Sequence, residues 1–316
     1  MASILVIYNP VAGRGRRVRK EWPAVEAALL KSGIDFDAVP TSAPLEAVTL
    51  AREGAGKYKA VVGVGGDGTI HEIVNGLLQA SGERETIPLG VVPLGNGDDF
   101  AKMLPPEAPV GGKPFEWQVA ISKVVEGKTR LFDAVRMLGD NGMSEAEGTP
   151  HYFANAMDVG FGAHTVLNFA TIPKVLKGMP SYMAAVLKTL INYTSLRLRI
   201  QLDDQPPFEQ ATTITAITNG RCFGGSFWVC PDAEADDGVL DVMVGEAVGR
   251  FTILRLIPKF LNGTHMNEPE IKMYCAQRVT LESESPLVVE ADGEIPYTET
   301  HRLEIDILPK KLCVFV

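Results

Sequence analysis

The feature that most constrains the fold is a glycine-rich turn, Gly65-Gly66-Asp67-Gly68-Thr69, placed between an apolar run and an amphipathic pattern. The run at 59–64 is typical of a buried parallel strand, and the apolar spacing of i, i+3, i+4, i+7 and i+8 in 70–78 predicts a helix. The turn is therefore expected above a helix N-terminus, where backbone N–H groups and the helix dipole favour an anion. This arrangement predicts a phosphate site in an α/β structure.

Asp67 decides which phosphate chemistry this turn can serve. A bare carboxylate repels a pyrophosphate, but it is useful where a divalent cation lies between acid and phosphate, as phosphoryl transfer requires. The segment also spells Gly63-x-Gly65-x-x-Gly68, so a Rossmann dehydrogenase is an alternative, as is a purely structural turn with Asp67 as helix cap. The dinucleotide fingerprint normally follows the first strand, whereas this one follows at least two earlier strand–helix units. The position therefore favours phosphoryl transfer.

The order of the expected elements indicates two domains. Residues 1–130 alternate strand and helix patterns, which predicts a doubly wound parallel sheet with helices on both faces. Residues 131–316 contain mainly short strand-like runs, which predict an antiparallel β-sandwich whose C-terminal segment can return to the first domain. The strands expected in the second domain are Leu131–Met137, His151–Met157, Leu196–Leu202, Ala211–Thr218, Val239–Val244, Val279–Glu282, Leu287–Glu290 and Leu303–Ile307.

Composition excludes some classes of partner. The formal net charge of −9 argues against nucleic acid, because such binding needs basic surfaces that displace counterions. The four cysteines lack the CxxC spacing of a metal site and suggest a reducing compartment. The sequence starts without a basic leader and has no stretch of about 18 uncharged apolar residues. We therefore expect a cytoplasmic protein that reaches a membrane only at its surface.

Two more glycine-rich turns follow predicted strands. The first is the segment 9–17, where Asn9 can hydrogen-bond the turn, Gly13 and Gly15 permit close backbone approach, and Arg14 or Arg16 can meet a phosphate. The second is the stretch 93–101, which includes Gly95-Asn96-Gly97-Asp98. The carboxyl ends of parallel strands share one edge of the sheet, where ligands bind, so the three turns are expected to meet there.

Acidic residues gather at two places late in the chain. The segment 231–241 holds five acids beside a turn glycine and suits a hard-cation site, although a solvated acidic turn is an equal alternative. The segment 290–294 places the turn Asp292-Gly293-Glu294 directly after a strand. A carboxylate there can take the proton of an attacking hydroxyl as a general base, although such a turn is more often a simple hairpin.

Taken together, these motifs resemble the diacylglycerol-kinase catalytic family, specifically the soluble bacterial-type lipid kinases related to sphingoid and ceramide kinases. The resemblance covers essentially the whole chain, with its motifs in the right order. It implies ATP as phosphate donor, Mg²⁺, an ATP-binding α/β domain, a lipid-binding β-sandwich and catalysis in the cleft between them. The expected product is a lipid such as diacylglycerol phosphorylated on its hydroxyl group.

The resemblance also implies roles for individual residues. Asp67 is expected to be catalytic, and the base is expected in the Asp-Gly-Glu turn, as either Asp292 or Glu294. A structural magnesium site carries over to the Asp237 side chain, with backbone oxygens near Glu234 and Val239. The residues implied for ATP are Asn9, Pro10, Gly13, Arg14, Thr41, Gly65, Gly66, Asp67, Gly68, Thr69, Glu72, Gly95, Asn96 and Asp98.

One departure from the family pattern affects this set. Asn96 and Asp98 stand where the family typically has threonine and asparagine, so Asp98 adds a charge near the expected nucleotide. Rival hypotheses are a kinase of a soluble acceptor, related to NAD kinase, and a catalytically decayed nucleotide- or lipid-binding protein. The segment Leu167–Tyr193 is either a mobile amphipathic element that meets anionic lipid or a pair of helices covering the β domain. The lipid acceptor and a homodimer are left open.

Overall fold

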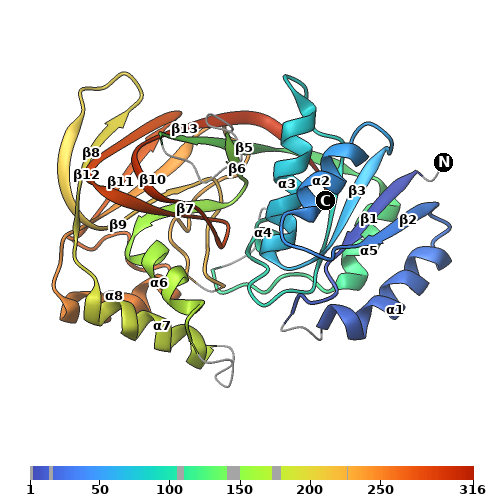
Figure 1. Ribbon diagram of the computed structural model, residues 1–316, viewed down its shortest axis with the longest axis horizontal. Coiled ribbons are helices and arrows are strands. Elements are labelled where there is room, and N and C mark those ends of the chain that lie inside the picture. The colour runs from blue at the N-terminus through green and yellow to red at the C-terminus, as the bar shows by residue number, and fades with distance from the viewer. Residues whose placement is uncertain (1–2, 14–16, 105–109, 141–149, 173–178, 226) are drawn as a thin grey trace. The chain divides into compact units, whose positions relative to one another are not determined.

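The computed structural model describes residues 3–13, 17–104, 110–140, 150–172, 179–225 and 227–316 (Figure 1). The chain divides into two compact units, which we describe separately. Unit 1 comprises Met1–Ala134, Ala235–Asp237 and Leu308–Val316. Unit 2 comprises Val135–Glu234 and Gly238–Ile307. The last residues of the chain therefore belong to the same unit as the first.

Unit 1 is an α/β structure built on a parallel sheet, as the alternating pattern predicts. Four strands lie in the order β4-β3-β1-β2, with every neighbouring pair parallel, and the end of β13 (Glu294–Phe315) joins β4 in parallel. The strands are β1 (Ile4–Tyr8), β2 (Phe36–Pro40), β3 (Ala60–Gly65) and β4 (Leu89–Pro93). The helices are α1 (Arg17–Lys31), α2 (Glu46–Gly54), α3 (Asp67–Ser81), α4 (Asp99–Met103) and α5 (Trp117–Glu126).

The two faces of this sheet are covered by different helices. Val62 and Val64 of β3 share a core with apolar residues of α1 and α5. The residue between them, Gly63, faces the opposite way, and a Cβ on it would lie 2.7 Å from the Cδ1 atoms of Ile70 and Ile73 in α3. Side chains alternate across a strand, so glycine here lets α3 pack directly on the sheet. This packing fixes the N-terminus of α3 at the carboxyl end of β3.

Unit 2 is mainly antiparallel. Its strands are β5 (Thr129–Gly139), which starts in unit 1, then β6 (His151–Phe153), β7 (Ala156–Gly160), β8 (Leu196–Leu202), β9 (Phe208–Thr218), β10 (Leu240–Glu246), β11 (Ile271–Ala276), β12 (Arg278–Ala291) and β13 (Glu294–Phe315), which ends in unit 1. The long strands β9 and β12 each pair with β7 along one half and with β8 along the other. They thereby enclose a core of apolar residues drawn from all four strands.

Three helices of unit 2 complete the fold: α6 (Phe161–Phe169), α7 (Met179–Asn192) and α8 (Arg250–Leu261). In the described part of Leu167–Tyr193 lie the last residues of α6 and the whole of α7, and neither of the two interpretations of that segment is tested by this; α8 was not predicted. The single strand expected at His151–Met157 is wrong: it is two strands, β6 and β7, with a break at Ala154 and Asn155. No helix in the described parts of the chain has the length and apolar character needed to cross a membrane.

Candidate functional site

The three glycine-rich turns of unit 1 meet, as the parallel sheet predicts. A Cβ on Gly13 would lie 2.4 Å from the backbone oxygen of Leu94, and a Cβ on Gly95 would lie 2.4 Å from the Cα of Gly66. Larger residues therefore cannot replace these glycines without moving the backbone. Gly13 also has a φ of +64°, a conformation that glycine adopts readily. The close approach gathers the ends of β1, β3 and β4 beside the N-terminus of α3.

Asp67 is the first residue of α3 and is half-buried at this junction. Its Oδ1 atom accepts hydrogen bonds from the backbone N–H groups of Asp99 (2.6 Å) and Phe100 (3.3 Å), which caps the short helix α4. Burial, together with the charges of Asp99 and Asp98, raises the pKa of Asp67 to about 7. A nearby cation would strongly stabilise the ionised form of such a buried carboxylate.

Asp98 has a local partner that the sequence did not reveal. It adopts a φ of +52°, its Oδ1 accepts the N–H of Gly95 (2.8 Å), and its Oδ2 lies 3.6 Å from the Nη1 of Arg17. Burial raises the pKa of Asp98 to about 6, while the Gly95 amide and Arg17 act in the opposite direction. The charge that departs from the family pattern therefore stabilises the turn after β4 and is opposed by an arginine.

Arg17 and Lys102 were missed as site residues. Arg17 donates a hydrogen bond from Nη1 to the backbone oxygen of Gly95 (3.0 Å). Lys102 is 7% exposed and forms an ion pair with Asp99 (2.8 Å). The signal for Arg17 was present in the basic run after Gly13, one position beyond the expected arginines. Buried Lys102 had no signal, because its position depends on the packing of α4.

The other residues expected at the ATP site occupy different positions. Asn9 closes its own turn through Oδ1, which accepts the N–H of Val11 (3.0 Å). Thr41 follows β2, and its N–H donates to the Tyr8 oxygen (2.9 Å). Glu72 caps α2, since its two carboxylate oxygens accept the N–H groups of Leu45 and Ala47. Pro10 directly follows Asn9 in the turn after β1. Gly68 and the buried Thr69 lie in the first turn of α3, and Asn96 is exposed. Arg14 lies outside the described residues.

The acidic segment 231–241 forms a loop with mixed roles. Asp236 is bound by Arg130, whose Nη2 lies 2.6 Å from Oδ2. Asp237 and Glu234 are exposed, and Val239 is half-buried. Within the described residues, no group of three or more His, Cys, Asp and Glu side chains is arranged to hold a metal ion. The magnesium site that the family resemblance implies, with the Asp237 side chain and backbone oxygens near Glu234 and Val239, stays a prediction.

The Asp-Gly-Glu turn of unit 2 joins β12 to β13. Asp292 has a φ of +49° and its N–H donates to the Ala156 oxygen (2.9 Å). Its carboxylate accepts the N–H groups of Ala154 (3.0 Å), Asn155 (3.1 Å) and Ala156 (3.1 Å), which explains the break between β6 and β7. Glu294, the second candidate base, is solvent-exposed. The two acids therefore have different surroundings although they are two residues apart.

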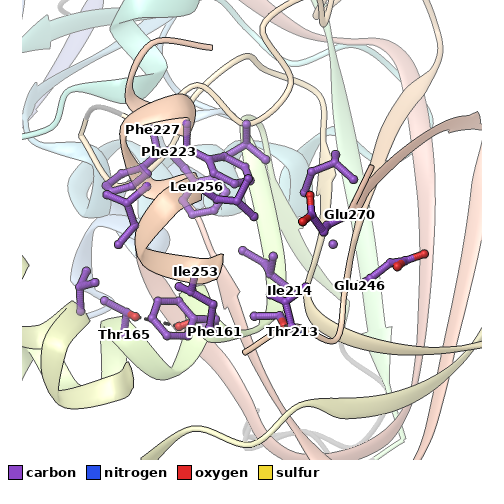
Figure 2. Close-up of a pocket in the computed structure, with 18 of the residues that line it drawn as sticks. Phe161, Thr165, Thr213, Ile214, Phe223, Phe227, Glu246, Ile253, Leu256 and Glu270 are labelled. Carbon is purple, nitrogen blue, oxygen red and sulfur yellow. Dashed lines mark hydrogen bonds between the residues drawn. The ribbon is translucent and has the colours of Figure 1, made fainter. Parts of the chain in front are cut away.

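Unit 2 also contains an apolar cavity of about 90 Å³ (Figure 2). Its wall includes Phe161, Phe223, Phe227, Ile253 and Leu256, which come from α6, α8 and the segment before β10. Two acids complete one end of the wall, and each is paired: Glu246 with Lys272 (2.7 Å) and Glu270 with Arg255 (2.6 Å). Since a water molecule takes about 30 Å³ in the liquid, the cavity has room for a short apolar segment.

Comparison with known proteins agrees with this two-part arrangement. The family model described as "Diacylglycerol kinase catalytic domain" matches residues 3–137, and that described as "YegS C-terminal NAD kinase beta sandwich-like domain" matches residues 156–316. A diacylglycerol kinase of Mycobacterium tuberculosis is 29% identical over 93% of this chain and 89% of its own length. A protein of Chromohalobacter salexigens named "Probable lipid kinase YegS-like" is 32% identical over 85% of this chain and 80% of its own length.

Solved structures share the fold. A diacylglycerol kinase structure from Bacillus anthracis superposes with a TM-score of 0.69 at 22% identity, covering 99% of this chain and 96% of that one. An NAD kinase from Archaeoglobus fulgidus in complex with ATP gives a TM-score of 0.53 at 14% identity, covering 99% and 93%. The two family models match in the order of the sequence, and the relatives span nearly all of the chain. This chain therefore belongs to the diacylglycerol-kinase catalytic family, a family of lipid kinases.

Proposed function

We propose that this protein transfers the γ-phosphoryl group of ATP, with Mg²⁺, to the hydroxyl group of a lipid such as diacylglycerol. The observation that carries the proposal is the junction of three glycine-rich turns at the N-terminus of α3, with Asp67 at its centre. Backbone N–H groups at a helix N-terminus bind phosphate, and Asp67 is an oxygen ligand of the kind that magnesium takes.

The residues of unit 1 fit a metal–nucleotide. Asp67, Asp98 and Asp99 bring three carboxylates to one place, whereas Arg17 and Lys102 bring two cationic groups. An added divalent cation would offset this excess of negative charge. Such an offset favours the ionised form of Asp67, which burial disfavours. Bound Mg²⁺ would neutralise charge on the transferred phosphoryl group. Asp67 would hold that ion, while Arg17 keeps the turn after β4 against the turn after β1.

For the acceptor hydroxyl, we propose that the Asp-Gly-Glu turn supplies the base. Asp292 already accepts three backbone hydrogen bonds and thereby fixes the turn. Glu294 is exposed and two residues away, so its carboxylate is the better placed to meet an incoming hydroxyl. The proton of the hydroxyl leaves to this carboxylate as the new O–P bond forms, and ADP leaves with the bond that breaks.

The apolar cavity supports a lipid acceptor over a soluble one. Its wall is almost entirely aromatic and aliphatic, and the two acids at its end are neutralised by Lys272 and Arg255. A nucleotide or sugar placed there would leave its polar groups without partners, whereas part of an acyl chain would not. The NAD kinase likeness is a likeness of fold alone, so it does not favour a soluble acceptor.

We also propose that unit 2 meets the membrane through an α7–α8 face, defined by Leu187, Ile191, Phe251 and Leu254. These side chains are 49%, 64%, 90% and 39% exposed, although all are large and apolar. The two helices touch, because Arg250 donates a hydrogen bond to the Ile191 oxygen (2.6 Å). Figure 1 shows α6, α7 and α8 together at one edge of unit 2.

Charge supports a phospholipid surface as the occupant of this face. Lys188 and Arg250 flank it, and neither forms an ion pair with a carboxylate within the described residues, in a chain of net charge −9. Apolar side chains bordered by basic ones bind anionic bilayers. The opposite faces of the same helices line the cavity, with Val186 from α7 and Leu256 from α8. A chain leaving the bilayer would therefore meet these helices first.

The test is turnover of ATP with a panel of dispersed diacylglycerols, sphingoid bases, ceramides, polyprenols and NAD. Phosphate incorporation into a lipid supports the proposal, whereas incorporation into NAD alone or into nothing overturns it. Membrane binding is measured separately by sedimentation with phosphatidylglycerol vesicles. Phe251→Ser is expected to weaken sedimentation and turnover on vesicles but to spare turnover of a water-soluble short-chain acceptor. Leu30→Ser, at a 66% exposed apolar site of unit 1, is the matched control and should change neither.

A further inference from the structure

Two buried acids lie directly beneath the Asp-Gly-Glu turn. Asp158 of β7 and Glu290 of β12 are 0% and 2% exposed. They are partners in the antiparallel register of these strands, so their side chains project from the same face at close range. Like charges at such a position repel, and an ionised pair in a dry interior is strongly disfavoured. Two carboxyl groups at this position therefore require a specific stabilising interaction.

The backbone hydrogen bonds of the pair leave one oxygen of each acid without a donor. Asp158 Oδ1 accepts the N–H of Ala163 (2.9 Å), and Glu290 Oε1 accepts the N–H of Gly293. The remaining atoms, Asp158 Oδ2 and Glu290 Oε2, are buried and receive no donor from the described parts of the chain. The two side chains are within hydrogen-bonding reach of each other. Two acceptors can bond to each other only when a proton lies between them.

We infer that Asp158 and Glu290 share this proton and are positioning residues that hold the Asp292-Gly293-Glu294 turn in its working conformation. The Glu290 carboxyl bonds the Gly293 amide at the centre of the turn, so it links β7 to the glycine that separates the two candidate bases. Loss of the proton would place two negative charges opposite each other and push Glu290 away from Asp158. The inference rests on the proposed lipid kinase activity for its effect on turnover, but not for the shared proton itself.

The surroundings of the pair support a retained proton at neutral pH. Burial raises the pKa of Asp158 to about 7, and burial together with the Asp158 charge raises the pKa of Glu290 well above its usual range. The titratable groups that face the pair are Asp292 from the turn and Tyr193 from the end of α7, whose ring contacts His164 of α6. No lysine or arginine pairs with either acid within the described residues, so a proton is the available counter-charge.

The test compares Glu290→Gln with Glu282→Gln, a control on the same strand whose acid is ion-paired with Arg199 and Arg302. Glutamine keeps the shape of glutamate and donates a permanent N–H to Asp158. In the wild type at pH 8, infrared spectroscopy is expected to show a protonated carboxyl band that Glu290→Gln removes and Glu282→Gln keeps. Asp158→Asn serves as a second variant that also supplies an N–H, should Glu290→Gln not fold.

The pH dependence of turnover distinguishes a titrating positioning pair from a merely structural one. Wild-type lipid phosphorylation should fall by about tenfold per pH unit once the pair loses its last proton. Glu290→Gln should retain turnover at neutral pH and lose this alkaline fall, because its donor does not titrate. An unchanged alkaline fall, or no difference in the carboxyl band, overturns the inference. If the wild type phosphorylates no lipid, the proposed function fails, and the infrared comparison still decides whether the proton is shared.

Discussion

Replacing Asp67 with asparagine should make the protein more stable while abolishing phosphoryl transfer. Burial and two neighbouring acids raise the pKa of Asp67 from 3.8 to about 7. A pKa change of one is worth about 1.4 kcal/mol, so ionised Asp67 costs the fold up to about 4 kcal/mol at pH 8. Asparagine is neutral, and its Oδ1 can still accept the N–H groups of Asp99 and Phe100. We expect a gain of about 2–4 kcal/mol, since the group is partly exposed and its burial penalty is screened by solvent.

The sign of the pH dependence distinguishes this cause from a general packing effect. A carboxyl whose pKa is raised on folding binds its proton more tightly in the folded state than in the unfolded state. Its contribution to stability is complete below about pH 4 and is lost as the pH rises towards 7. The gain of Asp67→Asn over wild type should therefore be near zero at pH 4, grow between pH 4 and 7, and stay level above.

Urea unfolding of the full chain at several pH values measures this difference. Asp35→Asn is the matched control, because Asp35 is an exposed acid of the same unit. Turnover of Asp67→Asn should fall by several powers of ten, the scale expected when a carboxylate ligand of the metal is removed. A variant that is less stable than wild type at pH 8, or whose gain does not depend on pH, refutes the reasoning. Normal turnover refutes the assignment of Asp67.

Three further outcomes are expected. Asp98→Asn should keep the turn, because the Asn oxygen can accept the Gly95 N–H. It should lower the KM for ATP, because it removes one negative charge. An unchanged or raised KM would count against a nucleotide beside Asp98. Glu294→Gln should reduce lipid phosphorylation by about 100-fold with an unchanged melting temperature, whereas Asp292→Asn should lower the melting temperature first. Thermal melting with and without Mg²⁺ should show a shift in the wild type that Asp237→Ala abolishes; no shift in the wild type would make the acidic loop a solvated turn.

Elements with a strong local signal were predicted well from the sequence. The buried strand before Gly65 and the helix after it follow from an apolar run and a helical period, and α3 contains the predicted pattern at 70–78, although it already begins at Asp67. The three turns meet because parallel strands leave the chain no other geometry, so this feature is a consequence of the fold class.

Features that depend on distant contacts could not be predicted. The break between β6 and β7 exists because three backbone N–H groups turn to Asp292, a residue more than 130 positions away. Helix α8 was missed although its sequence carries a basic side with Arg255 and Lys259; it is short, contains Pro258 and exposes the large apolar Phe251. Glu72 was assigned to ATP from its place in a motif, whereas its contacts, which cap α2, come from a neighbouring helix.

The candidate site keeps its acids at a cost to the fold. A chain selected only for stability would not bury Asp67 among two other carboxyl groups, nor place Asp158 opposite Glu290 in a dry sheet. Each arrangement raises the pKa of a carboxyl group, and such shifts are common at functional sites. In unit 1 the proposed metal–nucleotide would relieve the negative charge, so its binding should stabilise the fold. In unit 2 the proposed shared proton would do the same for the turn of Glu294, so we expect the acids of unit 1 to respond to metal and those of unit 2 to respond to pH.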